Sequence, residues 1–309
     1  MPTKYIHFTD EQKAQARQTD LCELHRSQGE KLKRSGSEYE WQDGSQKVTI
    51  RGNLWFHQYD QQGGDAIDFV RRFYNKDYPE AVEYLLSGCN GTLTVAPPIE
   101  RTPPKPFDLP PRNDNMRRVY AYLLSRRGLD RDVVYTFAHR LMIYESAQYL
   151  NAEFDGIDQE GVPRHANMRG TGSESTFKGN ADSSIPEYSF HWTGRSKYLL
   201  LFEAPIDMLS FISMHKKNWQ QHSYAAACSV SDRVLFQMLK DNPNISEVFL
   251  CMDSDAPGQT AAKRISDKLF TQGINAKILV PEHKDWNEDL LALNQEESEV
   301  EEPCQVLQL

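Results

Sequence analysis

Residues 198–207, YLLLFEAPID, and residues 247–255, EVFLCMDSD, each join a short apolar run to carboxylates that follow it at once. Such runs are typical of strands buried on both faces of a parallel sheet. Two further apolar runs are HSYAAACSV at 222–230 and AKILVP at 276–281, and helical patterns near 206–216, 231–241 and 257–272 separate the four runs. Strands that alternate with helices of this length predict an α/β domain built on a parallel sheet.

Acidic side chains gather where the predicted strands end. Ligands of an open parallel sheet bind beyond the carboxyl ends of its strands, and neighbouring strands lie only ~4.8 Å apart, so we expect these carboxylates to converge and repel one another. A hard divalent cation, Mg²⁺ or Mn²⁺, would relieve the repulsion, and two such ions can assist phosphoryl transfer. The alternative is that the acids merely favour helix N-termini. The six residues are Glu203, Asp207, Asp253, Asp255, Asp285 and Glu288.

Three segments resemble the motifs of the Toprim domain, which bacterial primases, topoisomerases and some nucleases share. They are LFEAPIDMLSF at 201–211, CMDSDAPGQTAAKRI at 251–265 and VPEHKDWNED at 280–289. The resemblance implies that Glu203 is the general acid/base. It also implies that the metal ligands are Asp207, Asp253, Asp255 and Asp285. The sequence departs from the pattern at Asn287, where bacterial primases usually have an aspartate, and Glu288 is the candidate substitute.

The segment upstream, FDGIDQEGVPRHANMRG at 154–170 with FKG at 177–179, resembles the part of bacterial primases that precedes Toprim. The resemblance implies contacts of Arg164, Arg169 and Lys178 with template or nucleotide phosphates. The alternative is that these cations serve solubility and pair with nearby acids. Two further arginines, Arg126 and Arg127, end a predicted helix, and they either contact DNA or form a solvated helix face.

The first 95 residues predict a small α+β domain: a helix over 9–34 with Thr9 as N-cap, short antiparallel strands in 38–59, and helices over 65–74 and 78–88. GGDAIDFVRRFY and YPEAVEYLL resemble the zinc-ribbon domain of bacterial primases. That family binds zinc through Cys-x₂-His and Cys-x₂-Cys.

Zinc is not expected in this domain. Cys22 and His25 have the first spacing but lie inside the predicted helix, and no Cys-x₂-Cys occurs. We predict instead an aromatic core of Trp41, Trp55, Phe56 and Tyr59, with stacking on single-stranded bases as the alternative.

Seven of the sixteen prolines lie between residues 97 and 111, so this segment is expected to be an extended linker. The predicted organisation is therefore a zinc-ribbon-like domain without zinc ligands, the linker, a basic primase-like subdomain, a Toprim domain and an acidic tail expected to be disordered. Their ranges are 1–95, 96–112, 113–195, 196–295 and 296–309. The fold class combines α/β and α+β domains.

Composition excludes several classes of protein. The net charge is −9, but residues 288–302 hold seven acids and no base, which leaves −2 for the rest of the chain; residues 101–140 carry nine bases and four acids, a local +5. The acidic total therefore does not exclude a nucleic-acid groove. No apolar run approaches the ~18 residues of a membrane span, no apolar signal core is present, and five scattered cysteines do not suit a disulfide scaffold. We expect a cytoplasmic protein with no membrane partner.

The phrases FEAPIDMLSF, RGTGSESTFKG and LLSRRGLDRDVV resemble LtrC-type primase-like proteins of conjugative plasmids and integrative elements. The resemblance implies single-stranded-DNA binding and metal-dependent primer synthesis from nucleoside triphosphates, with a helicase or relaxase as a possible partner. Two alternatives stay open: a non-catalytic single-stranded-DNA-binding accessory protein and a Toprim nuclease. A topoisomerase is not expected, because the chain is short for a DNA gate. Nor is a helicase motor, because no G-x₄-G-K-[ST] loop occurs.

Overall fold

The structure is a computed structural model that describes residues 8–43, 46–58, 60–87, 105–228 and 231–301. The chain divides into two compact units, Met1–Pro103 and Pro104–Leu309, and the division falls inside the proline-rich segment. Within the described ranges, no helix has the length and apolar character needed to cross a membrane. Each unit is described on its own below.

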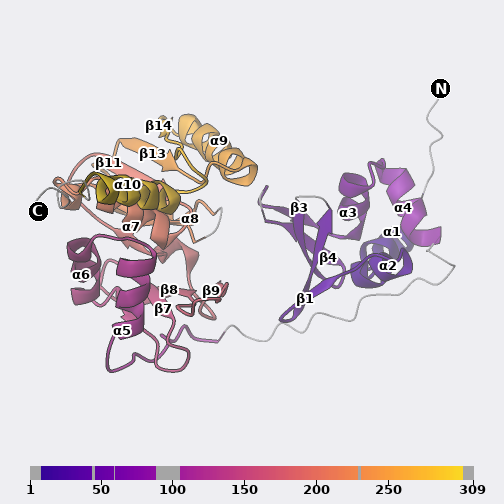
Figure 1. Ribbon diagram of the computed structural model, residues 1–309. Coiled ribbons are helices and arrows are strands. Elements are labelled where there is room, and N and C mark those ends of the chain that lie inside the picture. The colour runs from indigo at the N-terminus through magenta and orange to yellow at the C-terminus, as the bar shows by residue number, and fades with distance from the viewer. Residues whose placement is uncertain (1–7, 44–45, 59, 88–104, 229–230, 302–309) are drawn as a thin grey trace, which may run out of the picture. The chain divides into compact units, whose positions relative to one another are not determined.

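In its described residues, the first unit combines a meander sheet with four helices (Figure 1). The sheet is antiparallel with its strands in sequence order. The strands are β1 (Lys33–Ser35), β2 (Glu38–Asp43), β3 (Gln46–Arg51), β4 (Leu54–His57) and β5 (Gln62–Gly64). The helices are α1 (Asp10–Arg17), α2 (Leu21–Ser27), α3 (Ala66–Phe73) and α4 (Tyr78–Ser87).

The prediction of one helix over 9–34 is wrong. Thr9 does cap the first helix, because its hydroxyl accepts a hydrogen bond from the Gln12 amide. The helix ends after Arg17, and Asp20 begins a second one by accepting from two free amides of its first turn. Because the Asp20 side chain caps the start of a new helix, it favours two helices over one continuous helix. The spacing of apolar residues does not reveal such a cap.

The core of the first unit is aromatic, as predicted, but its members differ. Trp41 and Trp55 are buried, each at 6% exposure. Phe56 is 37% exposed, since β4 alternates and turns this residue to the other face, while Tyr59 lies outside the described residues. Phe69 and Phe73 pack against both tryptophans instead.

The second unit begins with short helices and an antiparallel sheet. The helical elements are α5 (Arg117–Tyr120), the π-helical turn η1 (Ala121–Arg126), α6 (Arg131–His139) and, after the sheet, η2 (Pro186–Tyr188). The sheet has the order β6-β7-β8-β9. Its strands are β6 (Ile143–Glu145), β7 (Ala152–Ile157), β8 (Pro163–Arg169) and β9 (Lys178–Asn180).

The predicted parallel sheet is confirmed. Its order is β10-β12-β11-β13-β14, with β10 antiparallel and the other four strands parallel. The strands are β10 (His191–Trp192), β11 (Tyr198–Phe202), β12 (Ser223–Ala226), β13 (Glu247–Cys251) and β14 (Asn275–Ile278). The helical elements are α7 (Pro205–Met214), η3 (Trp219–Gln221), α8 (Arg233–Asp241), α9 (Ala256–Thr271) and α10 (Trp286–Glu301).

The strand order creates a reversal point between β11 and β13. The chain moves from β11 to β12 on one side, and then crosses to β13 and β14 on the other side. Right-handed crossovers therefore place α7 on one face of the sheet, and α8 and α9 on the opposite face. In open sheets of this kind, ligands bind at the carboxyl ends of the strands where the two directions part.

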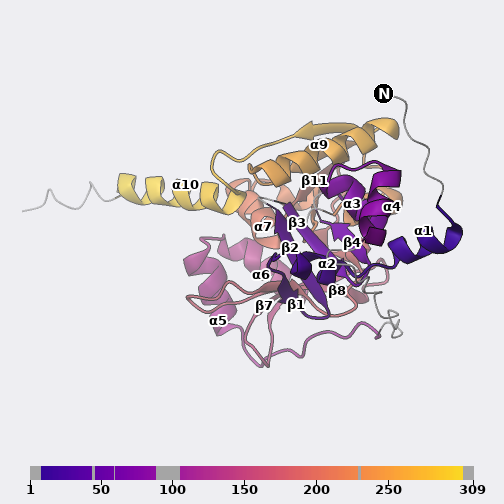
Figure 2. The same ribbon diagram turned by 90° about the vertical axis from the view of Figure 1, so that its right-hand side faces the viewer.

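The expectation that the acidic tail is disordered from residue 296 is wrong for its first part. Helix α10 continues to Glu301, and Figure 2 shows its C-terminal end extending beyond the other elements of this unit. Residues 302–309 lie outside the described residues. The backbone hydrogen bonds of α10 continue into the segment after residue 295, where apolar residues are rare.

A pair of acids on β7, Glu153 and Asp155, is buried without hydrogen-bond partners. They are 0% and 1% exposed, and none of their four carboxylate oxygens accepts a hydrogen bond from a described residue. Burial raises the pKa of Glu153 to about 7, and burial raises the pKa of Asp155 to about 8. The nearest cation is Arg112, whose Nη2 lies 3.9 Å from Asp155 Oδ2 and whose guanidinium stacks on the Tyr144 ring.

Candidate active site

Glu203 and Asp253 follow the ends of two neighbouring strands, at the reversal point of the sheet. Strands β11 and β13 are adjacent and parallel, with Phe202 aligned with Cys251, so the residues that follow both strands emerge at the same edge. Asp207 lies in the first turn of α7 and is 6% exposed. The parallel register therefore brings acids from two segments, about fifty residues apart, to one place.

Helix α9 begins directly beside Asp253. Asp255 is its N-cap, and Asp255 Oδ1 accepts from the Gly258 amide at 2.9 Å. A Cβ on Gly258 would lie 2.5 Å from the Asp253 carbonyl oxygen, so only glycine permits this approach. Gln259 Nε2 donates to the same carbonyl at 2.8 Å, which fixes the turn that presents Asp253 and Asp255.

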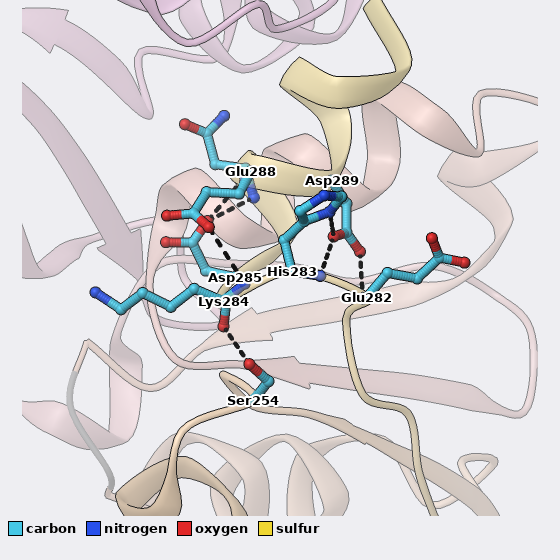
Figure 3. Close-up of polar contacts among 8 residues, drawn as sticks. Ser254, Glu282, His283, Lys284, Asp285, Glu288 and Asp289 are labelled. Atoms are coloured by element: carbon cyan, nitrogen blue, oxygen red, sulfur yellow. Dashed lines mark hydrogen bonds and ion pairs between the residues drawn. The ribbon is translucent and has the colours of Figure 1, made fainter. Parts of the chain in front are cut away.

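The segment after β14 is bonded to the end of β13. Ser254 donates to the Lys284 carbonyl through its amide at 2.9 Å and through its hydroxyl at 3.1 Å (Figure 3). Trp286 Nε1 donates to the Cys251 carbonyl at 2.9 Å. These bonds hold Asp285, at the start of α10, next to the loop that carries Asp253 and Asp255.

Asp285, Glu288 and Asp289 all accept backbone amides around the start of α10 (Figure 3). Asp285 Oδ1 accepts from the amides of residues 287 and 288 at 3.0 and 2.9 Å, and Glu288 Oε2 accepts from the Lys284 amide at 3.2 Å. The alternative that these acids merely favour helix N-termini therefore holds in part for Asp255 and Asp285, because one carboxylate oxygen of each caps a helix.

Burial and mutual repulsion raise the pKa values of the three inner carboxylates. The pKa of Glu203 is raised to about 7 by burial, then by Asp253 and Asp255. The pKa of Asp253 is raised to about 6 by burial and by the charges of Asp285 and Asp255, and Asp207 is raised well above its ordinary pKa for the same two kinds of reason. Asp253 Oδ1 is moreover buried and has no hydrogen-bond partner.

Two of the five predicted cations face this carboxylate cluster. Arg169 and Lys178 are register partners on β8 and β9, so their side chains share a face of the sheet. Arg169 partly offsets the raised pKa of Glu203 and of Asp207, and Lys178 partly offsets that of Glu203 and of Asp253. Arg169 Nε is buried without a hydrogen-bond partner.

The structure does not bring the other three predicted cations into the cluster. Arg164 Nε bonds Asp158 at 2.7 Å, Arg126 donates to the Gly172 carbonyl at 2.8 Å, and Arg127 donates to the Tyr122 hydroxyl at 3.1 Å. Sequence reasoning missed Lys284, which partly offsets the raised pKa of Asp253. Its place inside the third acidic motif was the available signal.

Asn287 is a structural residue. It is 2% exposed, its Nδ2 donates to the Arg127 carbonyl and to Ser210 Oγ at 2.8 and 3.0 Å, and its Oδ1 accepts from Arg127 Nη1 at 3.1 Å. These bonds tie α10 to α7 and to the end of the π-helical turn. An aspartate could not donate two of them, which explains an amide at this position.

The donor types and charges suit a divalent cation. Carboxylate oxygens are the ligands that Mg²⁺ prefers, and an unpartnered Asp253 oxygen among repelling acids is a position that a cation would stabilise. Across the described part of the chain, however, no three His, Cys, Asp or Glu side chains stand close enough together to form a ready metal site. The cluster therefore contains side chains of the type that bind a cation, but they do not lie in the arrangement of a finished coordination site.

Comparison with known sequences finds a family match over the parallel sheet of the second unit. Residues 200–290 match the family described as Toprim-like, and residues 121–196 match a family described only as a protein of unknown function. The chain thus contains a Toprim-like domain, which confirms that resemblance. An uncharacterized protein of Bacillus anthracis is 24% identical over 216 residues, which are 65% of this chain and 62% of that protein. The chain thus spans less than two thirds of this relative's length.

Several solved primases share similarity with the chain. The Aquifex aeolicus primase, in a structure with its zinc-binding and RNA polymerase domains, is 15% identical, with 95% of this chain and 85% of that chain covered and a TM-score of 0.39. The primase fragment of the bacteriophage T7 primase-helicase is 14% identical, with 87% and 94% covered and a TM-score of 0.45. The Escherichia coli primase catalytic core is 16% identical, with 60% and 71% covered and a TM-score of 0.41.

Proposed function

We propose that this protein is a primase-like nucleotidyltransferase that uses Mg²⁺ or Mn²⁺ to join nucleotides on a single-stranded DNA template. The observation that supports this most strongly is the cluster of Glu203, Asp207 and Asp253 at the reversal point of a Toprim-like sheet, faced by Arg169 and Lys178. Acids beside cations suit a site that binds both metal and polyphosphate.

In this proposal, the aspartates hold the cation and Glu203 moves a proton. Asp207, Asp253 and Asp255 would bind a divalent cation, with Asp285 and Glu288 at its margin, and the cation would neutralise charge on a nucleoside triphosphate. Glu203, with its pKa raised to about 7, is suited to accept a proton from an attacking 3′-hydroxyl near neutral pH. These roles are proposed from the position of each acid in the fold and from the charges around it.

The two cations on β8 and β9 would bind phosphate oxygens. Arg169 and Lys178 reach the carboxylates electrostatically from a separate sheet, so a triphosphate between the two sheets would meet positive charge on one side and the metal on the other. An arginine presents several donors in a planar fork that suits phosphate. A mobile-element setting and a helicase or relaxase partner belong to the same proposal and rest on the sequence resemblance.

The test is synthesis of labelled oligonucleotides from nucleoside triphosphates on mixed single-stranded templates, with Mg²⁺ or with Mn²⁺. We expect product from the unsubstituted protein and from Asp267→Asn, a control at an exposed aspartate of α9 outside the cluster. We expect at least a hundredfold less product from Asp253→Asn, in the range that loss of an electrostatic catalytic group costs. No product on any template with either metal would contradict the proposal.

A second candidate is a non-catalytic single-stranded-DNA-binding accessory protein. Two observations favour it. The described acids do not form a ready metal site, and one oxygen each of Asp255 and Asp285 accepts a hydrogen bond from a backbone amide at a helix N-terminus. DNA binding without product, and without dependence on metal, would support this candidate. Degradation of the labelled template that Glu203→Ala abolishes would instead identify a Toprim nuclease.

A further inference from the structure

An apolar groove crosses the α7 face of the parallel sheet. Tyr224, Leu200 and Phe249 are register partners on β12, β11 and β13, so their side chains form a row on one face of the sheet. Phe202 lies two residues after Leu200 and therefore on the same face, where its ring centroid is 5.3 Å from that of Phe211 on α7. The groove has a volume of about 300 Å³, and none of the acids of the candidate site lines it.

The core of the second unit is incomplete along this groove. Four of the apolar side chains that line it pack against the core and are still only half-buried. They are Tyr198, Phe211, Phe249 and Leu279. Lys277 Nζ lies 5.5 Å from the centroid of the Phe249 ring, and Lys197 Nζ lies 5.3 Å from the centroid of the Tyr198 ring. A lysine stem covers part of an apolar surface while its ammonium group stays in water. A contiguous apolar surface that remains accessible is typical of an interaction site.

The charge around the groove is positive. The basic side chains in its lining are Lys217, His215 and His222. No acid is among the described residues that line it. Lys197 and Lys277, which lie at its aromatic rings, both pair with Glu247. Three lysines beside one glutamate leave an excess of positive charge, so an occupant that brings acids next to apolar residues is complementary to the groove.

Residues 299–309, EVEEPCQVLQL, have this composition. The acids are Glu299, Glu301 and Glu302, and the branched apolar residues after them are Val306, Leu307 and Leu309. Residues 302–309 lie outside the described residues and belong to the same compact unit as the sheet. The sequence of this segment therefore offers acids for the basic rim and apolar side chains for the groove itself.

The end of α10 is close enough for this segment to reach the groove. His215 lines both the groove and an adjoining cavity of about 360 Å³, and Leu293 and Glu296 of α10 line that second cavity. From Glu296 to Glu301 the helix advances about 7.5 Å. Residues 302–309 span up to about 26 Å when they are extended. The segment is thus long enough to return from the end of α10 to the groove.

We propose that residues 302–309 dock into this groove of their own chain. Val306, Leu307 and Leu309 cover the half-buried apolar side chains, and the acids that precede them meet the lysines of the rim. Docking completes the core on the α7 face of the sheet. The proposal goes beyond the proposed function and does not depend on it, because it uses none of the acids of the candidate site and its test contains no DNA, nucleotide or metal.

The experiment measures binding of a fluorescent peptide of residues 299–309 to the full chain. The tail variant combines Val306→Ser, Leu307→Ser and Leu309→Ser, so that its own segment cannot dock. We expect the peptide to bind the tail variant, and to bind the unsubstituted chain roughly tenfold or more weakly, because the tethered segment competes at an effective concentration in the millimolar range. A peptide with the same three serine substitutions should bind neither protein.

A matched pair of substitutions, each added to the tail variant, locates the binding site. Leu279→Asp in the groove should weaken peptide binding roughly tenfold or more, because an aspartate there would lose hydration when the peptide covers it. Leu141→Asp should leave binding unchanged, since Leu141 is 57% exposed and does not line the groove. Equal peptide affinity of these two proteins would overturn the proposal.

Hydrogen exchange tests the same claim without a substitution in the groove. Backbone amides of residues 211–217 and 276–281 should exchange more slowly in the unsubstituted chain than in the tail variant, because docking protects the segments it covers. Equal exchange would overturn the proposal, as would a peptide that does not bind the tail variant or that binds both proteins equally. A dimer in light scattering that the tail variant loses would place the segment on a second copy and overturn docking within one chain.

Discussion

Replacing the buried acid Asp155 by asparagine should make the protein more stable at alkaline pH and leave it almost unchanged at acidic pH. Asp155 is 1% exposed, its oxygens have no hydrogen-bond partner, and burial raises its pKa from 3.8 to about 8. Between these values the folded chain keeps the proton and the unfolded chain loses it. The free energy of unfolding therefore falls as pH rises through this window, because the unfolded state binds fewer protons.

The size of the effect follows from the pKa difference. Each pKa unit corresponds to about 1.4 kcal/mol, so a shift of about four units sets an upper limit of about 6 kcal/mol. We expect about 2–4 kcal/mol between pH 5 and pH 8.5, since the effective dielectric constant around buried charges exceeds that of a dry interior. Asparagine has a similar shape and cannot ionise, so the variant escapes this loss.

The assay is urea denaturation of the full chain at pH 5, 7 and 8.5, with the difference between variant and unsubstituted protein taken at each pH. This difference cancels the titration of groups that do not interact with Asp155, such as the carboxylate cluster, and leaves Asp155 with its coupled neighbour Glu153. Asp267→Asn, an exposed control, should show no pH-dependent difference. Parallel curves for Asp155→Asn and the unsubstituted protein from pH 5 to 8.5 would refute the reasoning that Asp155 is a buried, protonated acid.

Three further results are expected at the candidate site. Gly258→Ala should destabilise the protein by about 1–3 kcal/mol in urea and abolish Mn²⁺ binding, because its Cβ would lie 2.5 Å from the Asp253 carbonyl oxygen; unchanged stability would contradict the packing described. Asn287→Asp should cost about 1–3 kcal/mol and add no activity, since two donated hydrogen bonds disappear; a gain of product would show that residue 287 is a metal ligand. Affinity for Mn²⁺, measured by calorimetry, should rise from pH 5 to pH 7.5 as the proposed ligand Asp253 and its neighbour Glu203, with pKa values raised to about 6 and about 7, lose their protons; a flat profile would argue against a cation bound beside these two acids.

The sequence predicted the parallel sheet well because its strands are continuous apolar runs bounded by acids and helices. The same runs located the carboxylates, since in a parallel sheet the residue after each strand has a fixed place. Periodicity did not find the break at Asp20, where one capping side chain decides between one helix and two. Nor did it show that α10 continues to Glu301.

Which cations face the acids could not be read from sequence. Arg164 and Arg169 lie on the same strand, yet Arg164 pairs with Asp158 and Arg169 reaches the carboxylates, where the register of β8 with β9 places it opposite Lys178. Asn287 looked like an eroded ligand, but its three hydrogen bonds to distant segments give it a structural reason. Long-range partners of this kind leave no pattern in the residues nearby.

The most direct test of the central claim is Mn²⁺ binding, followed through the electron paramagnetic resonance signal of the free ion, at pH 7.5. The account predicts that the unsubstituted protein and Asp267→Asn bind Mn²⁺ equally, and that Asp253→Asn binds at least tenfold more weakly because it lacks a charged ligand at the end of β13. Equal binding by Asp253→Asn, or no binding by the unsubstituted protein, would contradict the claim that these carboxylates form a metal site.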